Sequence, residues 1–368
     1  MSVIRQIGPN WFTTVMGIGI VSGLTFTSPL HIDGQQVTGE ILFGILNVVF
    51  ITAIFMWGLR WILHSSEAMD DFRHPTRALF YGALSMAINV VGNDYLLVGA
   101  NMFNSTVAID ISKVIWIVGA AASLFTVIVV PYLLFTEHQV EHHQTVASWL
   151  IPVVPPIVAG ATGMNLIPYW PSAQLQLSLT VVCIAFFGIT FFLFIMISSL
   201  VYGRLVYYRR LNGESTPSLW IEIGPIGMSM ATLCELPVKT QAILSPYTNI
   251  LHGMAMVISI ALWGVGVWWI VISSMHTILH LSKRGDGLPF NLGWWSYVFP
   301  IGSFTNGTYA LTHLMSLQFF TVAGFVQLLI LWICFIVVAI RTAIAVAKGH
   351  LIQWTFQRHS HHPMAQKA

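Results

Sequence analysis

The chain has 368 residues, of which 56% are hydrophobic and only 8% are charged. Because an ordinary soluble domain carries roughly 25% charged residues, this chain has too little charge to cover a water-exposed surface. The formal net charge of +2 is also too small to indicate a nucleic-acid partner, so the composition predicts a protein embedded in a lipid bilayer.

Apolar runs long enough to cross ~30 Å of hydrocarbon as a helix recur along the whole chain. Ten such runs cover approximately residues 11–29, 38–63, 76–100, 112–135, 148–168, 174–206, 218–244, 249–279, 290–314 and 318–347. No hydrophilic stretch between them is long enough for a second domain. Residues 1–368 are therefore predicted to form one all-α integral membrane domain with a short cytoplasmic tail at about 349–368.

The basic residues predict how this domain is oriented. Ten spans place both termini on one side, and every Lys and Arg except Lys113 and Lys239 falls on that side or at helix ends facing it. Because Lys and Arg favour the cytoplasmic side of a membrane, both termini are expected in the cytoplasm. The bilayer is expected to be the plasma (inner) membrane.

Proline and glycine divide the ten segments into two alternating kinds. The odd segments carry prolines such as Pro155, Pro225 and Pro300 with glycines nearby, whereas the even ones are longer and more uniformly apolar. Proline inside a helix kinks it and frees a carbonyl, which needs protein or water beside it in a membrane. We therefore expect the odd helices inside, the even helices facing lipid, and a helical hairpin repeated five times. The alternative is that Gly and Pro are simply common in membrane helices.

The odd segments carry hydroxyl and amide side chains in place of charges. Such groups can hydrogen-bond a passing ion while it sheds water, without trapping it. They can equally bond to neighbouring helices, and the recurrence in five segments is what favours a lined path. The predicted lining residues are Thr13, Gly17, Arg77, Asn89, Asn165, Thr232, Ser303 and Asn306.

Two acids lie within the odd segments. A carboxylate inside a membrane is costly, so Asp94 and Glu235 are candidates for proton coupling. Both occur late in their segments, nearer the outer surface than the centre. They could instead pair with Lys239 or face water at the outer mouth. Arg77, at the start of the third segment, could anchor the helix at the interface or draw anions into an inner vestibule.

Sequence signatures of enzymes are weak here. Residues 138–142 read HQVEH, a spacing used by one metalloprotease class, but they fall in a short loop without an obvious third ligand. His359, His361 and His362 in the tail are similarly weak indications of metal binding. Because the chain also lacks a P-loop, a nucleophile elbow and a dinucleotide fingerprint, we predict no enzyme activity, no metal and no cofactor.

An ordered set of short motifs resembles the tellurite-resistance/dicarboxylate transporter family, which includes slow anion channels, a malate permease and a sulfite pump. The motifs are residues 8–12 (GPNWF), 16–19 (MGIG), 74–77 (HPTR), 224–225 (GP) and 294–300 (WWSYVFP). The resemblance extends over nearly the whole chain. The opening segment and residues 31–48 look most like the malate-permease and sulfite-pump branch.

The resemblance implies five helical hairpins around a central pore, a homotrimer with one pore per subunit, and a phenylalanine plug, which the motif places at Phe299. It implies transport of a small anionic substrate, with C4-dicarboxylates such as malate as the first expectation. Few basic residues fall in the odd segments, which fits a monovalent anion channel or a sulfite exporter equally well.

Overall fold

The computed structural model describes residues 3–30, 32–138 and 140–349, and within them it contains helices and no strand. The predicted tail and its three histidines lie outside these residues. The helices are α1 Phe12–Thr27, α2 Gln35–Leu63, α3 Ser65–Arg73, α4 Tyr81–Asp94, α5 Ala100–Met102, α6 Ser105–Thr136, α7 Pro155–Leu166, α8 Ala173–Tyr207, α9 Ile223–Lys239, α10 Thr248–Leu281, α11 Phe299–Met315 and α12 Gln318–Ala347.

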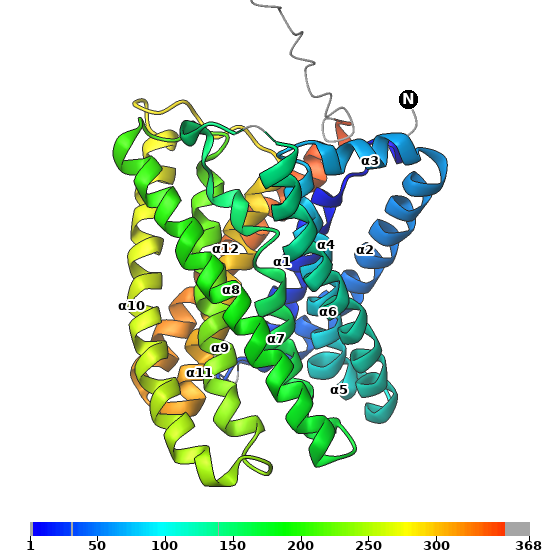
Figure 1. Ribbon diagram of the computed structural model, residues 1–368, viewed down its shortest axis with the longest axis vertical. Coiled ribbons are helices and arrows are strands. Elements are labelled where there is room, and N and C mark those ends of the chain that lie inside the picture. Colours follow the sequence, from blue (N-terminus) through cyan, green and yellow to red (C-terminus); the bar gives the residue numbers. More distant parts are fainter. Residues whose placement is uncertain (1–2, 31, 139, 350–368) are drawn as a thin grey trace, which may run out of the picture.

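Five of these helices form a closed ring. α1 contacts α4, α4 contacts α7, α7 contacts α9, α9 contacts α11, and α11 returns to α1. A long helix packs outside each of them, and it is always the next long helix in the chain: α2 on α1, α6 on α4, α8 on α7, α10 on α9 and α12 on α11. Figure 1 shows the long helices α8 and α10 running the full height of the molecule.

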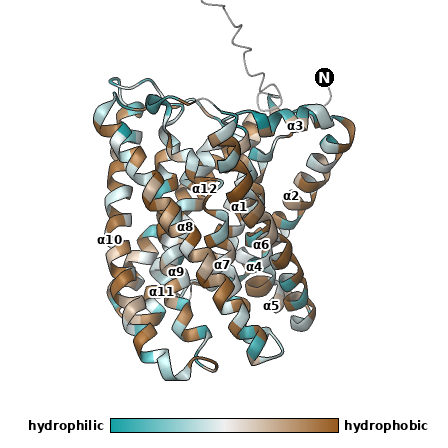
Figure 2. Ribbon diagram, in the orientation of Figure 1, coloured by the Kyte–Doolittle hydropathy of each residue, from teal (hydrophilic) through white to brown (hydrophobic). Residues whose placement is uncertain are grey.

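The ring helices are buried and the outer helices expose apolar side chains. Nearly every residue of α1 and α7 is buried, whereas α8 exposes Val181 and Phe192, and α12 exposes Ile333. Figure 2 shows hydrophobic residues along the length of the long helices. An apolar surface this extensive is typical of contact with lipid.

Within the described part of the chain, six helical segments are long and apolar enough to cross a membrane by length and composition: Gln35–Leu63, Ala78–Met102, Ser105–Thr136, Ala173–Tyr207, Ser245–Leu281 and Gln318–Ala347. The remaining ring helices α1, α7, α9 and α11 have only 16, 12, 17 and 17 residues. A short 3-10 helix precedes each ring helix, and it rises about 2.0 Å per residue, more steeply than an α-helix. These 3-10 helices are Pro9–Trp11, Ala78–Phe80, Ala147–Leu150, Thr216–Glu222 and Leu292–Tyr297.

The prolines predicted to kink the ring helices instead begin them. Pro155 and Pro156 are the first residues of α7, Pro225 is the third residue of α9, and Pro300 is the second of α11. Proline suits the first turn, because its missing N–H would have had no partner within the helix. The expected kinks at these positions are therefore wrong, although Pro131 in α6 and Pro237 in α9 do lie inside helices.

Helix α3 was not among the predicted spans. It lies across one end of the molecule, at the same end as the N-terminal segment (Figure 1). Its sequence SSEAMDDFR is too short and too polar to cross a membrane, and it carries Asp71, which is buried.

Candidate functional site

Three cavities follow one another along the axis of the ring. The largest, the vestibule, measures about 600 Å³ and lies at the end where the ring helices begin. Its wall is mostly formed by the segments that lead into those helices. Polar wall residues include Asn10, Thr76, Ser148, Asn212, Ser215, Ser218, Asn291 and Ser296.

The middle cavity measures about 40 Å³ and shares Phe80, Ile151 and Ser296 with the vestibule. Each ring helix, or the segment that leads directly into it, contributes to its wall near the helix start. The contributing residues are Thr13, Met16, Phe80, Ala83, Met86, Ile151, Val154, Ile221, Gly224, Pro225, Trp295, Ser296, Phe299 and Pro300. The wall is predominantly apolar, and the Phe299 side chain within it is only 3% exposed.

The distal cavity measures about 50 Å³ and shares no wall residue with the middle cavity. Its wall is more polar than that of the middle cavity and includes Thr27, Asn93, Asp94, Thr162, Asn165 and Asn306. The Asn165 side chain donates a hydrogen bond to Asn93 Oδ1 over 3.1 Å, which joins α7 to α4. Amide and hydroxyl groups on α1, α4, α7 and α11 thus face one small space.

Charged side chains are few along this axis, so the backbone dipoles of the ring helices also contribute to its electrostatics. Among the described residues that line the middle and distal cavities, none is basic. The vestibule carries Arg204, His143 and Glu214. Because all the ring helices start at the vestibule, their N-terminal ends, each equivalent to about half a positive charge, point toward it.

The predicted lining residues, the predicted plug Phe299 and the candidate proton-coupling acid Asp94 divide between the cavities and the helix interfaces. Thr13 and Phe299 line the middle cavity, and Asp94, Asn165 and Asn306 line the distal cavity. The structure therefore brings these five side chains to the axis.

Four other predicted residues lie in helix packing. Gly17 packs against Trp295, where a Cβ atom would overlap the indole ring. Asn89 faces α6, where its amide donates to Ser123 Oγ over 3.1 Å. Thr232 and Ser303 donate their hydroxyl protons to carbonyl oxygens one turn earlier in their own helices, so they do not offer them to the axis.

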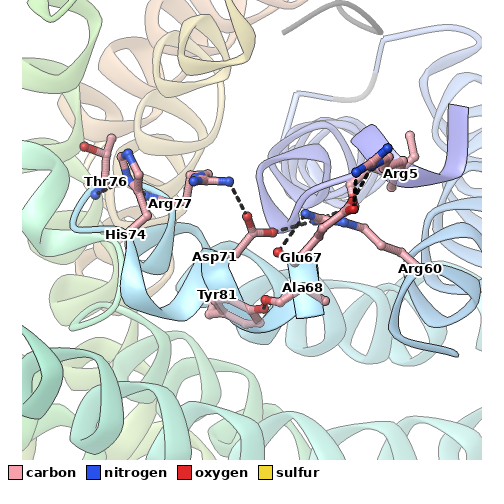
Figure 3. Close-up of polar contacts among 10 residues, drawn as sticks. Arg5, Arg60, Glu67, Ala68, Asp71, His74, Thr76, Arg77 and Tyr81 are labelled. Carbon is pink, nitrogen blue, oxygen red and sulfur yellow. Dashed lines mark hydrogen bonds and ion pairs between the residues drawn. The ribbon is translucent and has the colours of Figure 1, made fainter. Parts of the chain in front are cut away.

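Arg77 belongs to an ion-pair network at the end of α2 (Figure 3). Its guanidinium lies 2.9 Å from Asp71 Oδ1, and the other Asp71 oxygen pairs with Arg60. The Asp71 and Arg60 side chains are 2% and 6% exposed. These residues line a separate cavity of about 120 Å³ with the N-terminal segment, so Arg77 lies beside the vestibule instead of in its wall.

The same network is closed at its exposed edge by Arg5 and Glu67 (Figure 3). The hydrogen bond from the Arg5 guanidinium holds the pKa of the Glu67 carboxyl below its ordinary value. Arg60 and Arg77, which both pair with Asp71, and the outer Arg5–Glu67 pair together link the N-terminal segment, α2, α3 and the segment that leads into α4. Glu235 lies elsewhere, on α9, and pairs with Lys239 one turn later over 3.5 Å.

In the loop between α6 and α7, which carries the histidine motif at residues 138–142, Glu141 has a structural role. The Glu141 side chain accepts a hydrogen bond from the backbone of Gln144, whose own side chain bonds back to the Glu141 N–H. This reciprocal pair caps the turn His142–Gln144. Within residues 3–30, 32–138 and 140–349, no cluster of three or more His, Cys, Asp or Glu side chains could hold a metal ion.

One further buried acid was not predicted from the sequence as a candidate residue. Glu222, at the end of the 3-10 helix Thr216–Glu222, is fully buried and lines none of the three axial cavities. The rule that singled out Asp94 and Glu235, an acid within an apolar segment, applies equally to the sequence WIEIG around it.

Comparisons with known proteins point in one direction. The sequence profile of the voltage-dependent anion channel family matches residues 6–343. An uncharacterized transporter of Methanocaldococcus jannaschii is 27% identical over 357 residues, 96% of this chain and 97% of that protein. A sulfite efflux pump of Trichophyton rubrum is 26% identical over 87% of this chain and 86% of its own length. A malic acid transport protein of Schizosaccharomyces pombe is 21% identical over 90% of this chain and 77% of its own length.

Proposed function

Since the chain belongs to the voltage-dependent anion channel family, we propose that it moves small anions across a membrane along the axis of its ring helices. The observation that carries this proposal is the common direction of α1, α4, α7, α9 and α11, whose first turns surround the middle cavity. Anions are stabilised at helix N-termini. An anion from the vestibule therefore meets a favourable potential without a fixed cation that would hold it.

For the arrangement in the membrane we propose ten transmembrane helices, grouped as five hairpins, with both termini in the cytoplasm of the plasma (inner) membrane. In this arrangement Lys113 and Lys239 lie outside and the remaining basic residues inside. Labelling Lys113→Cys and Arg210→Cys in intact cells with a membrane-impermeant thiol reagent tests it. We expect label on the first variant only, and the reverse pattern would overturn the orientation. The homotrimer rests on the family resemblance.

The closed point of the path is proposed to lie at Phe299. Its ring lines the middle cavity together with Met16 and Met86, and the next cavity along the axis is separate. Most side chains in the wall of the middle cavity are apolar, so a hydrated ion finds few polar partners there while the ring is in place.

The proposed substrate is a small monovalent oxyanion, with hydrogensulfite as the leading example. A dianion would need balancing positive charge, and the described residues lining the middle and distal cavities include no Lys or Arg. The small size of both cavities and the sulfite pumps among the relatives support this choice. Malate, the C4-dicarboxylate expected from the sequence, is the second candidate, supported by the malic acid transport protein and acting as its monoanion.

Reconstitution into proteoliposomes tests the function directly. Uptake and current would be measured with sulfite, malate, succinate, nitrate and chloride, with protein-free liposomes as the control. Saturable sulfite or malate uptake with counterflow and little chloride current would identify a carrier. Large nitrate or chloride currents that follow the driving force would identify a channel and exclude the dicarboxylate. Absence of flux for all five anions would refute the proposed function.

A further inference from the structure

Among the described residues lining the middle and distal cavities, Asp94 is the one acid or base. It is the last residue of α4, is 2% exposed, and lies in the wall of the distal cavity beside Asn93, Asn165 and Asn306. One carboxyl oxygen, Oδ2, has no hydrogen-bond partner. The other faces Gly23 of α1, where a Cβ atom would lie only 2.7 Å from Oδ1. Glycine at that position leaves the room that the carboxyl occupies.

Among the described residues that line the distal cavity, none supplies this carboxyl with a compensating positive charge. The nearby Ser22 hydroxyl donates its hydrogen bond to the Gly39 carbonyl over 3.2 Å, and Asp94 is the only titratable side chain among the described residues that line the distal cavity. α1 and α7 carry no titratable residue. The charged or titratable groups on the other neighbouring elements are Glu40 and Arg60 on α2, Tyr95 after α4, Asp110, Lys113 and Tyr132 on α6, Cys234, Glu235 and Lys239 on α9, and Tyr309 and His313 on α11.

The basic members of that set are engaged elsewhere. Lys113 pairs with Asp110 over 3.1 Å, Lys239 pairs with Glu235, and Arg60 pairs with Asp71 at the opposite end of α2. An ionised Asp94 would therefore stand alone in a small cavity whose described wall residues include no basic side chain, and its negative charge would repel any anion that approaches it. The same side chain in its protonated form is neutral and offers an O–H donor.

We propose that Asp94 is the proton-binding group that makes anion passage acid-dependent, because a monovalent oxyanion occupies the distal cavity only while this carboxyl is protonated. The proposal rests on the proposed function and names the regulation of its path. The proton enters from the aqueous phase, resides on a carboxylate oxygen and donates a hydrogen bond to the anion. When it leaves, the cavity would hold two negative charges, and the anion is expelled. The asparagine amides supply further N–H donors to the same oxyanion.

The chain provides a matched control in Glu222, which is also a buried acid but lines none of the axial cavities. Asp94→Asn keeps the shape and removes the charge, and Glu222→Gln does the same away from the path. Asp94→Ser is a second variant if the asparagine protein does not fold. Nitrate is the probe anion, since it stays a monoanion throughout the range from about pH 5 to pH 8, over which the experiment runs.

Nitrate influx into proteoliposomes is measured with the same pH on both sides. We expect wild-type and Glu222→Gln influx to fall by about 100-fold or more as the carboxyl ionises. Asp94→Asn should conduct at all pH values with little change. Wild-type influx that does not depend on pH, or an Asp94→Asn variant that keeps the wild-type dependence, would overturn the proposal and leave the transport function standing.

Infrared difference spectra of the purified protein provide a readout that needs no flux. A carbonyl-stretch band of a protonated carboxylic acid should appear in wild type, vanish in Asp94→Asn and persist in Glu222→Gln, and added nitrate should shift it. If no anion is transported yet the Asp94 band responds to nitrate, the proposed function fails and the proton-binding role stands. Absence of the band, or a band that nitrate does not move, refutes the role.

Discussion

Replacing Phe299 by alanine tests whether its ring closes the path. The ring is 3% exposed and lines the middle cavity with Met16 and Met86. Its loss enlarges that cavity toward the distal one, so the barrier to ion passage should fall. A barrier lower by about 1.4 kcal/mol already gives a tenfold faster flux. We expect at least that increase in nitrate current or uptake, together with a lower melting temperature, because truncating a buried Phe costs roughly 3–5 kcal/mol.

The matched control for this variant is Phe304→Ala on the same helix. Phe304 is fully buried, but its ring packs on Gly266 and Trp263 of α10, away from the axial cavities. It should lose stability as much as Phe299→Ala without gaining flux. A folded Phe299→Ala protein with wild-type flux, or an equal gain in Phe304→Ala, would refute the assignment of the plug.

Three further predictions concern stability, each measured by thermal unfolding in detergent. Asp71→Asn leaves the buried Arg60 charge without its counter-ion and should lower the free energy of unfolding by about 3–5 kcal/mol. Arg77→Met, whose native side chain is 33% exposed, should lower it by only about 0–1 kcal/mol. Equal losses in the two variants would contradict the assignment of Asp71 as the centre of the network. The lowered pKa of Glu67 means that its pair with Arg5 stabilises the protein above the ordinary pKa of a glutamate and loses this effect as pH falls below it. Arg5→Met should therefore weaken the acid-side loss, and an unchanged pH profile would argue against it. Gly227→Ala places a Cβ atom against the backbone of Ser303 and should cost about 1–3 kcal/mol by separating α9 from α11, while Gly253→Ala on α10, with open space around it, should cost nothing.

The sequence identified the buried segments well, because proline, glycine and small polar residues mark them. It also predicted the resemblance to the malate-permease and sulfite-pump branch, which the comparisons confirm. It could not tell which polar residue of a ring helix faces the axis. Asn165 and Asn89 have the same chemistry, yet Asn165 lines the distal cavity and Asn89 bonds to α6.

The reason is that a helix buried on every side carries no apolar stripe from which its inward face can be read. The ion-pair network was missed for a different reason. Asp71 lies in a short polar helix and Arg60 at the end of a long apolar one, and only the fold brings them together. The helix starts were misjudged because proline at the first turn and proline inside a helix look alike in a sequence.

The shortness of the ring helices has an electrical consequence. A bilayer core is ~30 Å thick, but the 12 residues of α7 rise only about 18 Å. In the proposed path, with water filling the vestibule down to the starts of these helices, the transmembrane potential would fall over the short stretch between the middle and distal cavities. The field there is correspondingly stronger than in the surrounding lipid. A unit charge gains about 2.3 kcal/mol per 100 mV over the whole potential, and an anion passing from Phe299 to Asn306 gains most of it within a few side-chain lengths.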